Sequence, residues 1–391
     1  MSSKIRPSLK LASFADSVFP VINRLAAEHQ AVNLSQGFPD FPAPDALKDA
    51  VCRAVQADIN QYPVTCGTPP FRAAIAREFT RRYGVPVHDD QITVGCGSTE
   101  AMMATLLATV NPGDEVIVFE PFYENYGPGT ILAGGSPRYV RLRPPDWRFD
   151  PAELAAAFND RTKAIVINTP NNPTGKVYDR EELQVIADLC QQWDVLAISD
   201  EIYEHIVYSG HQHVPIASLP GMAERTVTVN GLSKAYSVTG WRIGWAIAPL
   251  VLSPGIRKMH EFLTVAAPAP MQEAGVVALG LPDDYYTALA ADYERRRDVM
   301  LAILERHGFT CYAPSGAYYL MADVERFGFE DDFAFARHLA AEVGVASIPG
   351  SSFFSDPAAG RTLVRFCFSK RDETLTAADE RLAKLAAPSG R

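Results

Sequence analysis

The sequence predicts an α/β fold with a large domain and a smaller α/β domain. In the large domain, helices cover both faces of a mostly parallel sheet. Short apolar runs alternate with helix-like stretches through the middle of the chain. These runs are continuously apolar, which is typical of strands that are buried on both faces. From about Pro282 the pattern changes to a long charged helix followed by shorter elements.

The middle of the chain supplies the elements of the large domain. We expect helices at 98–110, where Asn111, Pro112 and Gly113 end the pattern, and at 180–193, with Asp179 placed to cap the first turn. We expect strands at 92–95 (ITVG), 115–120 (EVIVFE), 164–168 (AIVIN), 195–199 (VLAIS) and 226–229 (TVTV). Strands separated by helices in this way favour parallel pairing.

The C-terminal third supplies the smaller domain. A helix over 283–307 is ended by Gly308, and four short stretches lead to a final helix at 374–386. The Gly/Pro-rich segment QGFPDFPAP is typical of a crossing segment, so the first ~40 residues are expected to fold against this domain. At ~100–200 residues per domain, 391 residues allow two or three domains. We predict a large domain at 46–281 and a small domain at 1–45 and 282–391.

Composition excludes several function classes. The 36 basic and 46 acidic residues give a net charge of −10, which argues against general nucleic-acid binding. No apolar run reaches the ~18–20 residues of a membrane span. The six cysteines are scattered without a CxxC pair, as expected for reduced thiols in a cytoplasmic protein. We therefore expect a cytoplasmic protein with no nucleic-acid or membrane partner.

Candidate functional residues follow the strands, because ligands bind outside the carboxyl ends of parallel strands. Gly97, Ser98 and Thr99 follow the first strand and open a helix, whose N-terminus favours an anion. An ordinary strand–helix turn is the alternative there. Asp200 ends the fourth strand, where the alternatives are a helix cap and a buried ion pair.

Two cations are candidates for chemistry at the same sheet edge. Lys234 follows the last strand in an apolar and aromatic stretch, where desolvation lowers the pKa of an amine as Schiff-base chemistry requires. Most lysines are solvated surface groups, which is the alternative. Arg365 lies in the apolar strand VRFCFSK, where an arginine needs an anion. A buried ion pair would satisfy that need as well.

The combination is more specific than any one of these signals. A phosphate cradle, an acid, a lysine and an arginine are predicted to meet at one sheet edge. Pyridoxal phosphate needs this set, with the lysine for the imine and the acid for the pyridine nitrogen. A nicotinamide dehydrogenase is disfavoured because the third glycine of its fingerprint is missing after Gly95 and Gly97. No metal site is expected.

Four motifs in order, NTPNNPTGKV, SDEIYEHIVY, GLSKAYSVTGWRIGW and VRFCFSK, resemble those of the fold-type I pyridoxal-phosphate-dependent aminotransferases, class I/II. The resemblance covers nearly the whole chain. Within that superfamily, LSQGFPDFPAPD, INQYP, EPFYENY and IPGSSFF are similar to the kynurenine/glutamine–phenylpyruvate/methionine aminotransferase branch.

The resemblance implies a role for each matching residue. Lys234 would form the internal aldimine, and Asp200 would pair with the protonated pyridine nitrogen. Tyr203 and Asn172 would hydrogen-bond the ring hydroxyl, and Tyr123 would stack on the ring. These residues, with Lys234, Asp200 and Tyr203 as the catalytic group, would hold and activate the cofactor.

The remaining roles concern the phosphate and the substrate. Ser98, Thr99 and Arg242 would hold the phosphate, and Tyr62 would reach it from the neighbouring subunit of a homodimer. Arg365, with Asn172 and the backbone at Gly37, would bind the substrate α-carboxylate. Many relatives carry a phosphate-binding serine where this chain has Gly231. Ser233 is the candidate to replace that serine, and loss of that phosphate contact is the alternative.

The resemblance implies transamination between an L-amino acid and a 2-oxo acid. The stretch His260–Gln272, where relatives specific for dicarboxylates carry a second arginine, contains none. With Tyr126 and Phe14 or Phe38 nearby, we expect aromatic amino acids, kynurenine, methionine or glutamine as substrates. A C–S β-lyase or another pyridoxal-phosphate-dependent amino-acid enzyme on the same scaffold, such as an oxidase, is the main alternative, and a non-enzymatic binding or regulatory protein is a remote one.

Overall fold

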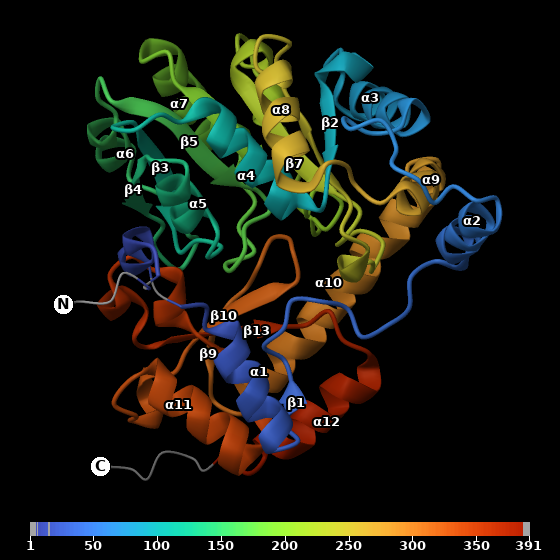
Figure 1. The fold of residues 1–391 in the computed structure, drawn as a ribbon. Coiled ribbons are helices and arrows are strands. Elements are labelled where there is room, and N and C mark those ends of the chain that lie inside the picture. Colours follow the sequence, from blue (N-terminus) through green and yellow to red (C-terminus); the bar gives the residue numbers. More distant parts are fainter. Residues whose placement is uncertain (1–4, 6, 15, 386–391) are drawn as a thin grey trace.

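The computed structural model describes residues 5, 7–14 and 16–385. Its largest sheet has seven strands in the order β2-β8-β7-β6-β5-β3-β4 and fills the upper half of Figure 1. All neighbouring pairs are parallel except those that β8 makes. The strands are β2 (Ile92–Gly95), β3 (Glu115–Glu120), β4 (Ser136–Arg141), β5 (Thr162–Asn168), β6 (Leu196–Asp200), β7 (Thr226–Gly231) and β8 (Gly244–Ile247).

Helices cover both faces of this sheet, as the continuously apolar strands predict. Alternate strand residues such as Ile117 and Ile165 pack with α6 and α7 on one face, whereas Val118 and Val166 pack with α4, α5 and α8 on the other. The helices of this part are α2 (Asp45–Gln56), α3 (Pro69–Tyr83), α4 (Ser98–Thr109), α5 (Tyr126–Leu132), α6 (Pro151–Ala157), α7 (Arg180–Gln192), α8 (Ser253–Thr264) and α9 (Ala269–Ala278).

Both ends of the chain build the lower part of Figure 1. A four-stranded antiparallel sheet has the order β12-β13-β10-β9, and β1 pairs in parallel with β11. The strands are β1 (Val32–Asn33), β9 (Thr310–Tyr312), β10 (Tyr319–Asp323), β11 (Val345–Ala346), β12 (Ile348–Pro349) and β13 (Leu363–Cys367). The helices are α1 (Phe19–Glu28), α10 (Asp283–Arg306), α11 (Asp332–His338) and α12 (Asp372–Leu382).

The α/β fold and each expected strand of the large sheet are confirmed, with shifts of one or two residues at some ends. Asp179 accepts the amide hydrogen bond of Glu182 and caps α7 as expected. The pairing of β1 with β11 supports the predicted assembly of the small domain from both chain ends. The boundaries at 46–281, 1–45 and 282–391 stay a prediction, and residues 1–4, 6, 15 and 386–391 lie outside the described chain.

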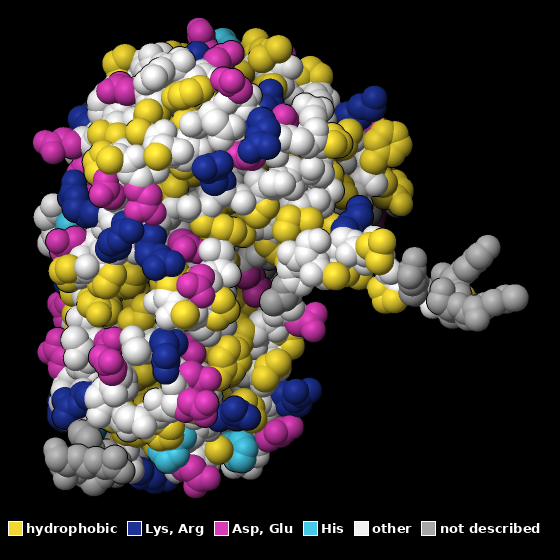
Figure 2. Space-filling model, turned by 90° about the vertical axis from the view of Figure 1, so that its left-hand side faces the viewer, with side chains coloured by type: hydrophobic (Ala, Val, Ile, Leu, Met, Phe, Trp, Pro, Cys, Tyr) yellow, Lys and Arg dark blue, Asp and Glu magenta, His cyan; other side chains and the backbone are white. Residues whose placement is uncertain are grey.

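The surface and the helices show two further features. On the face seen in Figure 2, acidic and basic side chains are interspersed and form no large patch of one sign. Within the described residues, no helix combines the length and the apolar character needed to cross a membrane.

Candidate active site

A cavity of about 250 Å³ opens at the carboxyl ends of β5, β6 and β7. Most of the candidate residues named from the sequence line it, whereas Tyr62, Phe14 and Phe38 do not. The candidate residues in its wall are Gly37, Ser98, Thr99, Tyr123, Asn172, Asp200, Tyr203, Ser233, Lys234, Arg242 and Arg365. Strand ends that are far apart in the sequence therefore meet as the parallel topology predicts.

Asp200 is the acid at the base of this cavity. Its carboxylate is only 6% exposed, and it accepts hydrogen bonds from the Tyr126 hydroxyl (2.8 Å) and the Ile202 amide (3.2 Å). Burial raises the pKa of Asp200 to about 6, while the Tyr126 and Ile202 hydrogen bonds and the nearby Lys234 charge oppose the shift. At neutral pH most Asp200 side chains are therefore ionised. The two hydrogen bonds fix the orientation of this carboxylate in the cavity wall.

Lys234 is the amine of the cavity. Its Nζ donates to the Gly37 carbonyl at 3.1 Å and lies 5.7 Å and 5.8 Å from the ring centres of Tyr203 and Tyr318. Burial lowers the pKa of Lys234 to about 8, and the charges of Arg365 and Arg242 act in the same direction. A much larger fraction of this amine is thus neutral, and nucleophilic, than for a solvated lysine.

Lys234 is expected to react with a small aldehyde through its neutral amine with a midpoint near pH 8. Below that pH the ammonium form predominates, so reductive capture by cyanoborohydride should rise through pH 8 and then level off. The exposed Lys163 serves as the control for labelling of a solvent-accessible amine. Peptide mass mapping measures both sites, and equal pH profiles would contradict the lowered pKa.

The start of α4 forms an anion cradle beside Lys234. Ser98 is the first helical residue, and the preceding Gly97 has a φ of +89°. A Cβ atom on Gly97 would lie 2.3 Å from the Arg242 guanidinium, so only glycine lets that side chain lie against the helix start. Within the described chain, the amides of Ser98 and Thr99 have no hydrogen-bond acceptor. Free amides, a helix dipole and a guanidinium together suit a phosphate.

Gly231 shows why the serine of many relatives is absent here. A Cβ atom at this position would lie 2.7 Å from the Ile243 carbonyl oxygen and 3.0 Å from the Gly244 Cα. The strand β8 therefore approaches β7 too closely for any side chain. Ser233, two residues further on, does line the cavity. This geometry supports Ser233 as the replacement for the missing serine.

Arg365 is the fully buried cation of the cavity wall. Its guanidinium donates to the Asn172 Oδ1 (2.8 Å) and to the Ser35 carbonyl (2.7 Å), which uses two of the five N–H donors of an arginine. Its Nε has no partner among the described residues. The Tyr319 and Phe353 rings lie 4.2 Å and 5.0 Å from the Arg365 Cζ. Donors remain for a bound carboxylate.

Other predicted contacts are arranged differently in the single chain. Tyr62 is 84% exposed and outside the cavity wall, so a role there needs a second subunit. The aromatic wall contains Phe19 and Tyr319 rather than Phe14 or Phe38. Sequence reasoning also missed that Tyr126 binds Asp200 directly. Tyr126 is the first residue of α5, and no local pattern in the sequence indicates this contact.

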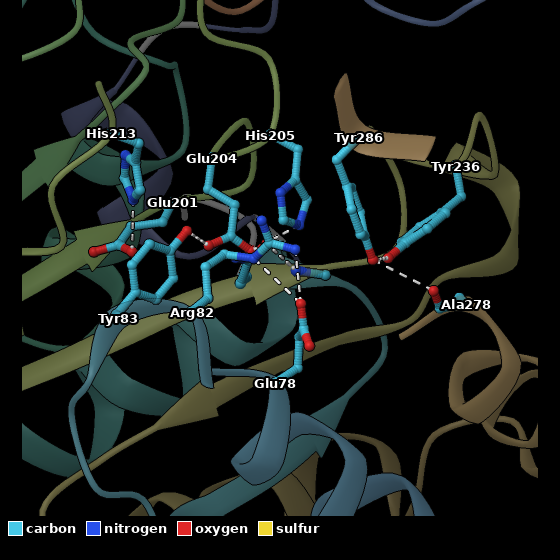
Figure 3. Close-up of polar contacts among 12 residues, drawn as sticks. Glu78, Arg82, Tyr83, Glu201, Glu204, His205, His213, Tyr236, Ala278 and Tyr286 are labelled. Atoms are coloured by element: carbon cyan, nitrogen blue, oxygen red, sulfur yellow. Dashed lines mark hydrogen bonds and ion pairs between the residues drawn. The ribbon is translucent and has the colours of Figure 1, made fainter. Parts of the chain in front are cut away.

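A buried polar cluster lies beside the turn that carries Asp200 and Tyr203 (Figure 3). Glu201, Glu204 and His213 lie close enough together to hold a metal ion. Each carboxylate oxygen is already engaged, however. Glu201 bonds Ser199 and His213, whereas Glu204 bonds Asn230 and Tyr83. We therefore interpret this cluster as an anchor for the 200–204 turn.

The sequence of this chain is similar to those of known proteins over nearly its whole length. The aminotransferase class I and II family matches residues 29–382 of the chain. Human kynurenine–oxoglutarate transaminase 1 is 40% identical, covering 92% of this chain and 94% of its own length. The methionine aminotransferase of Escherichia coli is 38% identical, covering 97% and 98%. These relatives differ in the substrates for which they are named.

Solved structures show the same similarity. The N-succinyldiaminopimelate aminotransferase of Mycobacterium tuberculosis superposes with a TM-score of 0.94 at 39% identity, covering 97% of this chain and all of the other. The aspartate aminotransferase of Thermus thermophilus gives 0.90 at 33% identity, with the same coverage. The chain therefore belongs to the class I and II aminotransferases, enzymes whose cofactor is pyridoxal phosphate.

Proposed function

We propose that this enzyme transfers the amino group between a 2-oxo acid and an L-amino acid of the aromatic, kynurenine, methionine or glutamine type. The observation that carries this proposal is one cavity that holds Lys234, Asp200 and Arg365 against aromatic side chains. Its lysines and arginines are Lys234, Arg242 and Arg365 only, as far as the described wall extends. We assign Lys234 to the cofactor, Arg242 to its phosphate and Arg365 to the substrate α-carboxylate. No cation of this wall is then left for a carboxylate on the substrate side chain.

The residues of the cavity fit pyridoxal phosphate. Asp200 is a buried acid with no cationic hydrogen-bond partner in the described chain, which suits a protonated ring nitrogen. Ser98, Thr99 and Arg242 suit the phosphate, with Ser233 next to them. Tyr203 and Asn172 suit the ring hydroxyl, and Tyr123 suits the ring face. When bound, this cofactor supplies an aldehyde for the amino group and a ring that accepts electrons from the substrate α-carbon.

The chain itself contributes proton transfer and orientation. The Nζ of Lys234 would hold the cofactor through its aldehyde and is the base placed to take a proton from the substrate α-carbon. Asp200, oriented by its hydrogen bonds from Tyr126 and Ile202, would favour a protonated ring nitrogen. Arg365 would bind the substrate α-carboxylate with its remaining donors. This contact would orient the substrate so that its α C–H bond points toward Lys234.

A substrate panel tests this function. Purified enzyme is mixed with each of several L-amino acids and a 2-oxo acid acceptor, and formation of the new oxo acid is measured. We expect turnover of phenylalanine, kynurenine, methionine or glutamine that requires the acceptor. Oxo acid and ammonia released without an acceptor would instead identify a C–S β-lyase or an oxidase.

We also propose a homodimer with shared active sites. Tyr62 lies in an exposed apolar region after α2, in which Val55, Ile59 and Val64 are 47%, 36% and 55% exposed. Apolar side chains gathered in this way are typical of an interface. Tyr62 from one subunit would then reach the phosphate held by the other.

Replacing Tyr62 by phenylalanine is expected to weaken cofactor retention about tenfold, because one hydrogen bond to the phosphate is lost. Mixed dimers provide the control. A Tyr62→Phe subunit paired with a Lys234→Ala subunit contains one site in which both residues are intact. Each such mixed dimer should recover retention and activity at one of its two sites. No recovery on mixing would contradict a shared site.

A further inference from the structure

We propose that Glu124 is a specificity-determining residue that excludes amino acids with a side-chain carboxylate. This inference rests on the proposed function, in which Arg365 binds the α-carboxylate. Glu124 lies between β3 and α5, next to Tyr123, and it lines the same cavity as Phe19, Lys234 and Arg365. It is a half-buried acid in the substrate part of the wall.

The Glu124 side chain is held in place by a neutral partner. The Ser17 hydroxyl donates to its Oε1 at 3.0 Å, and the Phe19 amide in turn donates to the Ser17 Oγ at 3.3 Å. No lysine or arginine of the described chain forms an ion pair with Glu124. Burial raises the pKa of Glu124, while the Ser17 hydrogen bond and the charge of Arg365 in the same wall oppose that shift.

Arg365 and Glu124 carry opposite charges and therefore act in opposite directions on the carboxylates of a substrate. Arg365 attracts the α-carboxylate, whereas an ionised Glu124 in the same wall repels a second carboxylate on the side chain. The free Oε2 of Glu124 accepts a hydrogen bond from an amide or an aromatic amine. The chemistry that fits is an amino acid whose side chain is uncharged and ends in a donor or an aromatic ring.

Glutamate and glutamine test this inference because they differ in charge but hardly in shape. We expect Glu124→Gln to raise the kcat/KM ratio of glutamate to glutamine about 10- to 100-fold, since the repulsion is removed. The glutamine side chain still accepts the Ser17 hydrogen bond. Ser17→Ala, which keeps the charge and removes that bond, should leave the ratio within about twofold, as should Glu181→Gln on the exposed face of α7.

Binding without turnover provides a second measurement. Calorimetry on the holoenzyme compares glutarate, a dicarboxylate, with its monoamide. The Glu124→Gln variant should bind glutarate about tenfold or more tightly, with the monoamide nearly unchanged. Unchanged ratios in both measurements would overturn the role of Glu124 while glutamine turnover upholds the transaminase. Absence of turnover with every amino acid would instead overturn the proposed function.

Discussion

Replacing Lys234 by alanine is expected to abolish transamination. The substitution removes the cavity's amine, whose pKa of about 8 makes it reactive near neutral pH. A positioned proton-transfer group alone contributes about 10²–10⁴-fold to a rate, and loss of cofactor attachment adds to this. We expect kcat/KM to fall by more than about 10³-fold. Asp200 and Arg365 stay in place, so the variant should still bind an amino acid.

Borohydride reduction separates loss of attachment from misfolding. In the wild type it should fix the cofactor to the peptide that contains Lys234, and mass spectrometry should detect the added mass. The Lys234→Ala variant should show no such addition. Lys163→Ala, on the exposed side of β5, provides the matched control and should keep both attachment and activity. Transamination by Lys234→Ala within tenfold of the wild type would contradict the assignment.

Local sequence patterns predicted the central strands, because the apolar run that favours burial of a strand lies within the strand itself. The apolar run 164–167 within β5 has no polar side chain, so burial on both faces is its stable arrangement. Two strands of the large sheet were not predicted. β4 is an edge strand in which Ser136 is exposed and Val140 is buried, so it presents no continuous apolar run. β8 is a short, buried apolar run that begins within the motif around Lys234 and Arg242 and was not recognised as a strand.

The cavity residues divide in a similar way. Asp200 and Lys234 could be predicted because each follows a strand whose end must lie at the ligand-binding edge of the sheet. Phe19 and the Ser35 carbonyl reach the cavity from the N-terminal segment, and no local pattern indicates that path. Glu124 was missed because an acid in a turn is ordinarily solvated. Only the folded chain shows that Glu124 is half-buried and lines the cavity.

Gly231 illustrates a limit of the motif. The resemblance identified Gly231 at the position of a serine found in many relatives, without giving a reason for the difference. The reason is the close approach of the Ile243 carbonyl, which belongs to a residue 12 positions later in the chain. A substitution that depends on a neighbouring strand is invisible until that strand is placed. Ser233 occupies the same wall without meeting this obstacle.

Replacing Arg365 by lysine is expected to raise the KM for the amino acid about 100-fold. Lysine keeps the charge but cannot make the planar two-point contact with a carboxylate. It also leaves the Ser35 carbonyl and the Asn172 Oδ1 without their buried donor, at about 1–3 kcal/mol for each unsatisfied group. Denaturant unfolding should therefore show a destabilised variant as well as weakened substrate binding.

Amino-acid amides separate the two effects of this substitution. A carboxamide in place of the α-carboxylate cannot form the charged contact, so the wild type should bind the amide far more weakly than the acid. Arg365→Lys should lose most of that discrimination. Arg296→Lys is the matched control, because Arg296 is a buried arginine of α10 that donates to the Lys370 carbonyl outside the cavity wall. The Arg296→Lys variant should be less stable than the wild type but should still bind the acid more tightly than the amide. If Arg365→Lys raised the KM of acid and amide by the same factor, the role of Arg365 would be structural, and another group would have to bind the α-carboxylate.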